Sequence, residues 1–165
     1  MKAIIGYAGT GKTTILKELA KKGYSVFNCD KWIHEQYNTD SIIKSELIKE
    51  LGNEIIVNNK VDRDILKNLI KKNNNILNLI EKITHPHLLK QIKNNKYDFV
   101  EIPILEYSPI DFTYLFDGII KLTRNINSEN WINKIIKPIR KINYIEIKNN
   151  NISDAVEEIL SNCVF

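Results

Sequence analysis

Gly6-Tyr7-Ala8-Gly9-Thr10-Gly11-Lys12-Thr13 is the stretch of sequence that decides the fold. It fits the pattern G-x-x-x-x-G-K-S/T, and it stands between an apolar run at 3–5 and a helical pattern at 13–22. Glycines at these positions let backbone N–H groups converge on phosphate oxygens, and the following helix adds its partial positive N-terminus. A glycine-rich turn with a surface lysine is the alternative, but the strand and helix on either side favour a phosphate-binding loop.

The pattern assigns a role to each side chain of this loop. Lys12 is expected to bridge the β- and γ-phosphates of a nucleotide, and the Thr13 hydroxyl is expected to bind Mg²⁺. The residues predicted to contact the nucleotide are Gly6, Ala8, Gly9, Thr10, Gly11, Lys12, Thr13 and Thr14.

Apolar runs alternate with helical patterns along the rest of the chain. Further strands are predicted at 24–27, 97–102, 116–122 and 142–147, stacked helices across 31–95, and a closing helix at 153–160 with Ser153 as its N-cap. Such alternation is typical of an α/β fold whose ligands bind at the carboxyl ends of parallel strands. We therefore expect five parallel strands with the 3–5 strand at the centre.

The length of 165 residues fits one ordinary domain, 1–165. With 43% hydrophobic and 27% charged residues, the chain is expected to fold. The net charge of +4 comes without a basic tract, and no window approaches a membrane span, so neither nucleic acid nor membrane is predicted as a partner. Cys29 and Cys163 are too few for a disulfide framework, which favours a reduced, cytoplasmic protein. The many Asn and Lys residues are discounted as a compositional bias.

A kinase is the class of phosphate-loop protein that best fits these features. The guanine-reading motifs D-x-x-G and N-K-x-D of GTPases do not occur, and 165 residues leave little room for a motor module. A small kinase needs a second pocket for the phosphate acceptor. The helical stretch 31–95, inserted between the second and third strands, is predicted to build it.

Beyond the loop, the order of motifs resembles the dephospho-coenzyme A kinase family over about two thirds of the chain. The matching motifs are Gly23 before a short strand, Asn28-Cys29-Asp30 where the family has Asp-Ala-Asp, Leu51-Gly52, Arg63 with Leu66, Thr84-His85-Pro86, and Glu101-Ile102-Pro103-Ile104-Leu105. The resemblance implies a P-loop fold of the nucleoside-monophosphate-kinase type, a three-layer sandwich around a five-stranded parallel sheet. It also implies ATP and Mg²⁺, and phosphorylation of the ribose 3′-hydroxyl of dephospho-CoA to give coenzyme A.

Asp30 is the predicted catalytic carboxylate, acting with Lys12. Phosphoryl transfer to a hydroxyl needs a carboxylate that orients the nucleophile and accepts its proton, and Asp30 follows the strand beside the loop. A helix N-cap is its alternative role. Glu101, at the end of another strand, is predicted to bind Mg²⁺ together with Thr13, or else to be a solvated strand-end acid.

Three further residues are predicted to bind the acceptor. Arg63 offers a guanidinium suited to bidentate contacts, with a surface salt bridge as the alternative. His85 matches the family's His-Pro, with a helix cap or a core histidine as the alternative. Arg140 lies in 127–141, a segment predicted to be a shortened form of the family's lid, where Arg140 and Lys134 are the possible cationic replacements and a solvated basic face is the alternative.

The sequence departs from the family at two points outside the lid. Asn28 replaces the first Asp of the triplet, so Asp30 is expected to act alone there. Glu106 stands three residues past Pro103 rather than four, so the family's glutamate role does not transfer to it. Two other functions stay open: another P-loop small-molecule or nucleotide kinase, or a nucleotide-binding module that transfers nothing.

Overall fold

The computed structural model describes residues 1–39, 41–124 and 139–163. The chain divides into two compact units. The sheet unit comprises Met1–Cys29 and Ile92–Phe165, and the helical unit comprises Asp30–Gln91. Each is described by itself below.

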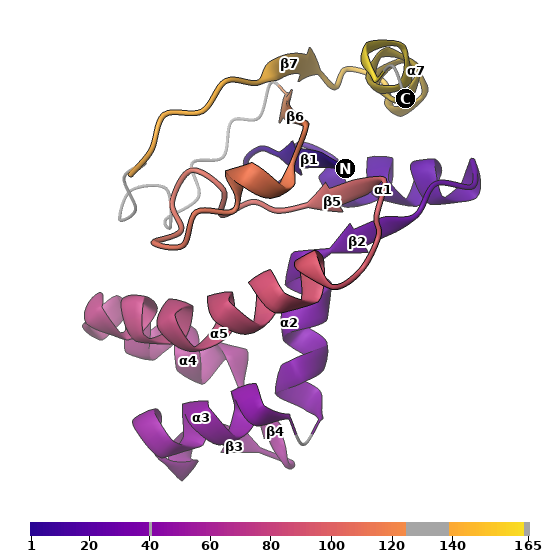
Figure 1. Ribbon diagram of the computed structural model, residues 1–165. Helices are drawn as coiled ribbons and strands as arrows, with labels where there is room; N and C mark the ends of the chain where they lie inside the picture. The colour runs from indigo at the N-terminus through magenta and orange to yellow at the C-terminus, as the bar shows by residue number, and fades with distance from the viewer. Residues whose placement is uncertain (40, 125–138, 164–165) are drawn as a thin grey trace. The chain divides into compact units, whose positions relative to one another are not determined.

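Five parallel strands form the sheet of the sheet unit (Figure 1). They are β1 (Lys2–Ile5), β2 (Val26–Asn28), β5 (Phe99–Glu101), β6 (Gly118–Thr123) and β7 (Ile145–Lys148). Their order is β2-β5-β1-β6-β7, so the strand that leads into the glycine loop is central, as predicted. The register aligns Ile4 with Glu101 and Asn28 with Glu101, which brings three strand ends to the same edge.

Helices α1 (Lys12–Lys21) and α7 (Ile152–Asn162) pack on one face of this sheet. Their apolar residues share a single buried cluster with the strands, consisting of Ile4, Ile15, Leu16, Leu19, Phe99, Ile120, Leu122, Ile147, Ala155, Val156, Ile159 and Cys163. Gly23, with φ of +94°, follows the end of α1 in the left-handed conformation that terminates helices. The N-cap of α7 is Asn151 and not Ser153, because the Asn151 side chain accepts from the Ser153 N–H.

In its described residues the helical unit contains four α-helices and one short 3-10 helix, η1. They are α2 (Cys29–Asn38), α3 (Ile42–Leu51), η1 (Asn53–Ile55), α4 (Arg63–Lys72) and α5 (Asn75–Lys93). They enclose a second apolar cluster formed by Tyr37, Ile43, Leu47, Ile55, Val61, Leu66, Ile80 and Ile83. The stacked helices predicted for 31–95 are present. One short antiparallel hairpin interrupts them, β3 (Ile56–Val57) with β4 (Lys60–Val61), which the sequence analysis missed.

Pro86 lies inside α5 and not at the start of a helix. The helix continues for ten residues before the His85-Pro86 pair, from Asn75 to Thr84. Thr84 and His85 are 2% and 3% exposed, so burial of this stretch outweighs the local preference of proline for a helix start. Among the described helices, none is both long enough and apolar enough to cross a membrane.

Candidate active site

The glycine loop follows β1 at the centre of the sheet edge and leads into α1. Gly6 has φ of +140°, and a Cβ built on it would lie 2.4 Å from the backbone oxygen of Leu122. Only glycine fits where the loop leaves β1 beside β6. Gly11 is the N-cap of α1 with φ of +91°, so the first turn of the helix opens directly from the loop. The strand, loop and helix predicted from the sequence are therefore present.

Lys12 bends its side chain back over the loop that precedes it. Its ammonium group donates to the carbonyl oxygens of Gly6 at 2.8 Å and Tyr7 at 2.9 Å. The residue is 7% exposed, so a positive charge is held against the loop in a largely desolvated position. A cation fixed there suits the negative charge of a bound phosphate.

Glu101 lies at the end of β5 and joins two neighbouring elements. Its carboxylate accepts from the hydroxyl of Thr13, with oxygen distances of 3.1 and 3.3 Å, and from the side-chain amide of Asn28 on β2. Glu101 is 3% exposed. The two residues predicted to bind Mg²⁺, Thr13 and Glu101, are thus in direct contact. Asn28 donates to this carboxylate, which an aspartate at that position would repel.

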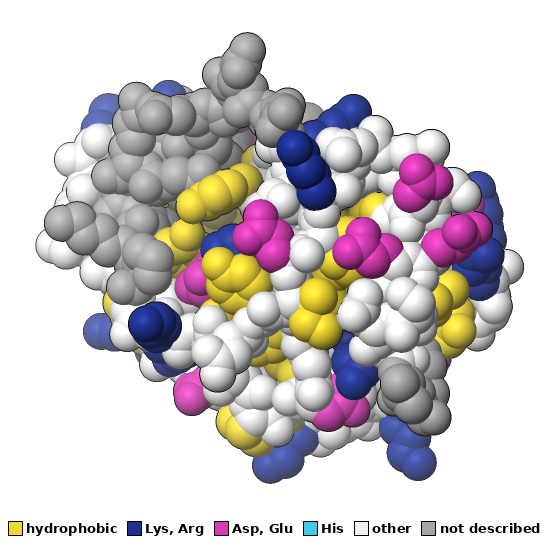
Figure 2. All heavy atoms as spheres, turned by 90° about the horizontal axis from the view of Figure 1, so that it is seen from above, with side chains coloured by type: hydrophobic (Ala, Val, Ile, Leu, Met, Phe, Trp, Pro, Cys, Tyr) yellow, Lys and Arg dark blue, Asp and Glu magenta, His cyan; other side chains and the backbone are white. Residues whose placement is uncertain are grey.

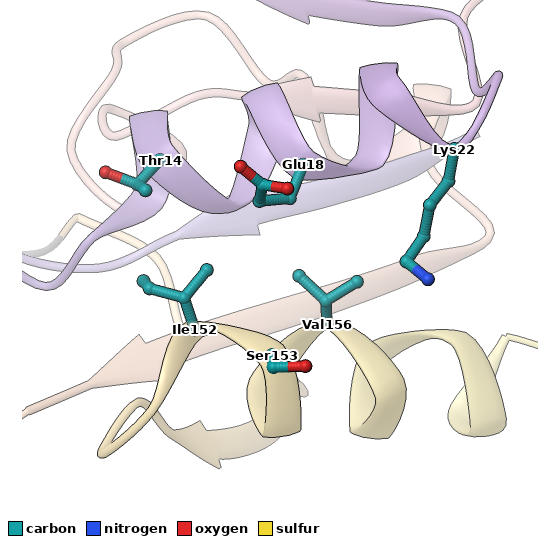
Figure 3. A pocket seen from close by; sticks show the side chains of 6 residues that line it. All are labelled: Thr14, Glu18, Lys22, Ile152, Ser153 and Val156. Atoms are coloured by element: carbon teal, nitrogen blue, oxygen red, sulfur yellow. The ribbon is translucent and has the colours of Figure 1, made fainter.

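A groove of about 400 Å³ runs between α1 and α7 (Figure 3). Its lining consists of Thr14, Glu18 and Lys22 from α1 and Ile152, Ser153 and Val156 from α7. Ile152 and Val156 point toward α1 and make the floor apolar (Figure 3). Thr14, predicted to contact the nucleotide, lies in this groove one residue beyond Thr13.

On the β6 side of the loop, a cluster of aromatic and charged side chains escaped the sequence analysis. Tyr7 of the loop forms a side-chain hydrogen bond with Tyr107, and burial together with the charges of Tyr7 and Glu106 raises the pKa of Tyr107 to about 12. Lys121 of β6 lies 3.5 Å from Glu106 and 4.5 Å from the centre of the Tyr144 ring. Where Figure 2 shows described residues, acidic, basic and hydrophobic side chains are interspersed on this face.

Asp30 lies in the first turn of α2, two residues after Asn28. It is exposed, and α2 already begins at Cys29, so Asp30 is not the N-cap. The charges of Asp30 and Arg63 both act on His34 and Tyr37 within the helical unit. Burial, then Arg63, lowers the pKa of His34, and Asp30 opposes this effect.

His34 was not among the residues singled out from the sequence, although a signal for it existed. It follows Asp30 at i+4, the spacing that brings side chains together on one helix face. Two residues predicted to bind the acceptor, Asp30 and Arg63, thus share one region with His34.

His85 is buried and Arg140 is partly buried. Burial lowers the pKa of His85 to about 4, so its ring is neutral at pH 7 inside the helical unit. The Nη1 atom of Arg140 donates to the backbone oxygens of Leu105, Ser108 and Ile110 at 3.1, 2.8 and 3.3 Å. Their roles as acceptor ligands stay predictions. Most of the predicted lid, 127–141, with Lys134, lies outside the described residues.

These features define a class of protein. A central parallel strand leads through a glycine loop into a helix, a lysine covers the loop, and an acid from the neighbouring strand contacts the loop threonine. This is the arrangement of a P-loop kinase. The described residues hold no group of three or more His, Cys, Asp or Glu side chains suited to a metal.

Comparisons with known proteins narrow the class. The family model for CoaE, dephospho-CoA kinase, matches residues 2–136, so this chain belongs to the dephospho-CoA kinase family. It is 32% identical over 130 residues to the dephospho-CoA kinase of Mycoplasma genitalium, a match that covers 74% of this chain and 66% of that relative. It is 30% identical to the dephospho-CoA kinase of Fusobacterium nucleatum, covering 97% of this chain and 96% of that relative.

The fold agrees with this family. The dephospho-CoA kinase structure from Campylobacter jejuni matches with a TM-score of 0.64 at 18% identity, covering 98% of this chain and 97% of that one. ATP-dependent phosphorylation of dephospho-CoA to coenzyme A is the reaction of the family. Membership of the family confirms three predictions: a P-loop kinase fold, kinase activity, and a place in coenzyme A synthesis.

Proposed function

We propose that this chain transfers the γ-phosphoryl group of ATP to the ribose 3′-hydroxyl of dephospho-CoA, with Asp30 as the proton acceptor. The observation that carries the proposal is the contact of Thr13 with Glu101 beside a glycine loop covered by Lys12. Family membership supplies the two substrates.

On the donor side, the loop and Lys12 hold the triphosphate. Lys12 lies over the loop through two carbonyl contacts, so its charge is in position before the nucleotide arrives. Fixed charge of this kind stabilises the negative oxygens of the transferring group without reorganisation. The apolar floor of the groove between α1 and α7 begins beside Thr14 and is suited to the uncharged part of the nucleotide.

Mg²⁺ fits the donor set. Thr13 and Glu101 offer hard oxygen ligands, and Mg²⁺ in kinases commonly takes one or two protein oxygens and completes its shell with phosphate and water. Thr13 and Glu101 would hold the ion. When bound, it would neutralise charge on the phosphates.

On the acceptor side, the Asp30 carboxylate takes the proton of the 3′-hydroxyl. The 3′-oxygen then forms a bond to the γ-phosphorus while the bond from that phosphorus to the bridging β-phosphate oxygen breaks, which releases ADP. The exposed guanidinium of Arg63 would bind phosphate oxygens of the acceptor. The charges of Asp30 and Arg63 both reach His34 and Tyr37, which supports a shared acceptor region.

The proposal includes a cytoplasmic location and ATP as the donor. Cys29 and Cys163 are both buried, and within the described residues neither forms a disulfide, which is consistent with a reducing compartment.

An Asp30→Asn variant tests the proposal. We expect turnover to fall roughly a hundredfold or more, the scale of a lost general base, while ATP affinity stays within a few-fold. Glu35→Gln is the matched control, because it also removes an exposed carboxylate from α2. Coupled detection of ADP with dephospho-CoA, nucleoside monophosphates and shikimate as acceptors measures both variants. Unchanged turnover by Asp30→Asn, or faster turnover with another acceptor, would contradict the proposal.

A further inference from the structure

Asn149 is a buried polar residue in the connection between β7 and α7. Only 1% of it is exposed, and its backbone N–H donates to the Thr123 oxygen at 2.7 Å. That bond continues the pairing of β6 with β7 by one residue beyond the end of β7 at Lys148. The residue is therefore held at the sheet edge, and its side chain leaves from a fixed point.

The Asn149 side chain reaches the glycine loop. Its Nδ2 atom donates to the backbone oxygen of Thr10 at 2.7 Å across 139 residues of sequence. The contact is close: a Cβ built on Gly11 would lie 2.3 Å from Asn149 Nδ2. Glycine is therefore required at position 11 for two reasons: the backbone has a positive φ, and a Cβ would clash with the Asn149 side chain.

The hydrogen bond from Asn149 to the Thr10 oxygen determines the direction of the Gly11 N–H group. The C=O of Thr10 and the N–H of Gly11 belong to one peptide unit, and none of the described peptide bonds is cis. In a trans unit these two groups point in opposite directions. Because Asn149 holds the Thr10 oxygen on its own side, the Gly11 N–H points away from Asn149. Hydrogen bonding at the oxygen also polarises the N–H of the same unit.

We propose that Asn149 is a positioning residue for the donor nucleotide, which orients and polarises the Gly11 N–H toward the phosphates in the loop. This inference rests on the donor half of the proposed function and not on the acceptor. The side chain contacts the backbone of the loop, so its role is to position the loop. A second anchor supports the loop from within, since the Thr10 hydroxyl donates to the Tyr7 oxygen at 2.9 Å.

Two variants of Asn149 test the inference. Asn149→Leu keeps the approximate volume and removes the donor, and Asn149→Asp keeps the shape but turns an acceptor toward the Thr10 oxygen. We expect both to weaken ATP and ADP binding, measured by titration calorimetry without acceptor, by about tenfold for Leu and more for Asp. In steady-state assays, the KM for ATP should rise while the KM for dephospho-CoA stays within about twofold.

Asn151→Ala is the matched control. Asn151 lies two residues away and caps α7 through Ser153, so this variant weakens the same connection without touching the loop. It should lower the melting temperature and leave ATP affinity unchanged.

The inference is overturned if Asn149→Leu behaves like Asn151→Ala, with a lower melting temperature and unchanged ATP affinity. It is also overturned if both KM values rise together. If Asn149→Leu does not fold, Asn149→Asp decides the question by the same criteria. ATP and ADP binding is measured without acceptor. If the chain fails to phosphorylate dephospho-CoA, the proposed function is contradicted, but the binding measurements still test the role of Asn149.

Discussion

The carboxylate of Glu101 lies 3.1 Å from the hydroxyl of Thr13, although 88 residues separate the two in sequence. β1 and β5 are neighbouring parallel strands, so the ends of both reach one edge of the sheet. This contact connects the phosphate loop to the Glu101 carboxylate, and the proposal that Thr13 and Glu101 bind Mg²⁺ rests on it.

Glu101→Gln removes one negative charge and keeps the size of the side chain. We expect turnover to fall about a hundredfold and the Mg²⁺ concentration for half-maximal activity to rise, because an amide is a poorer ligand for a hard cation. Turnover measured over a series of Mg²⁺ concentrations checks this. Glu146→Gln, on an exposed position of β7, is the control. An unchanged Mg²⁺ dependence of Glu101→Gln would remove this residue from the metal site.

Asn28→Asp places a second carboxylate against Glu101. Two acids in contact resist simultaneous ionisation, so we expect the melting temperature at pH 7 to drop by roughly 5 °C. Millimolar Mg²⁺ should restore most of this loss, because a cation between the carboxylates relieves their repulsion. Asn150→Asp adds the same charge on an exposed turn and should show neither effect. A melting temperature of Asn28→Asp that does not respond to Mg²⁺ would argue against a cation at this position.

The pH dependence of stability should report on His85. Burial lowers its pKa from 6.5 to about 4. Between these values the unfolded chain binds a proton that the folded chain does not. The free energy of unfolding is therefore at its full value above pH 6.5, and it decreases as the pH falls toward 4. One pKa unit corresponds to about 1.4 kcal/mol, so the loss amounts to about 3 kcal/mol.

His85→Gln should flatten this pH dependence. Glu81 lies one turn earlier on α5, and burial raises its pKa to about 6, so its effect on the pH dependence of stability is opposite to that of His85. Glu81 is present in both the wild type and the variant. The difference in unfolding free energy between wild type and His85→Gln, measured with urea from pH 4 to 7, isolates His85. A difference that does not change with pH would show that the buried imidazole does not titrate in this range.

Local patterns predicted the parts of the site that lie within one stretch of sequence. The motif at 6–13 places the loop, and the apolar runs give the strands, because a parallel strand buried on both faces needs a continuous apolar segment. The contact of Asn28 with Glu101 depends on the order of the strands, which no single stretch encodes. The sequence analysis placed the 24–27 strand, which Asp30 follows, beside the loop strand, and this was wrong, because β5 lies between β2 and β1.

One residue type, asparagine, misled the sequence analysis at two places. Asn58 and Asn59 have φ of 49° and 59° and form the turn of the β3-β4 hairpin, a geometry that asparagine tolerates. In a chain rich in asparagine their signal was lost. Asn149 was discounted for the same reason, although it is 1% exposed and bound to the loop. Composition explains how often a residue occurs and does not decide where it is buried.

Transfer of a labelled phosphoryl group tests the central claim most directly. The chain is incubated with Mg²⁺, dephospho-CoA and ATP labelled in its γ-phosphate, and the products are separated and identified by mass. We predict one labelled phosphate on the ribose 3′-oxygen of coenzyme A for each ADP released, and loss of both transfer and ATP binding in Lys12→Ala. Tight ATP binding without labelled coenzyme A, or ADP release with the label in free phosphate, would contradict the account.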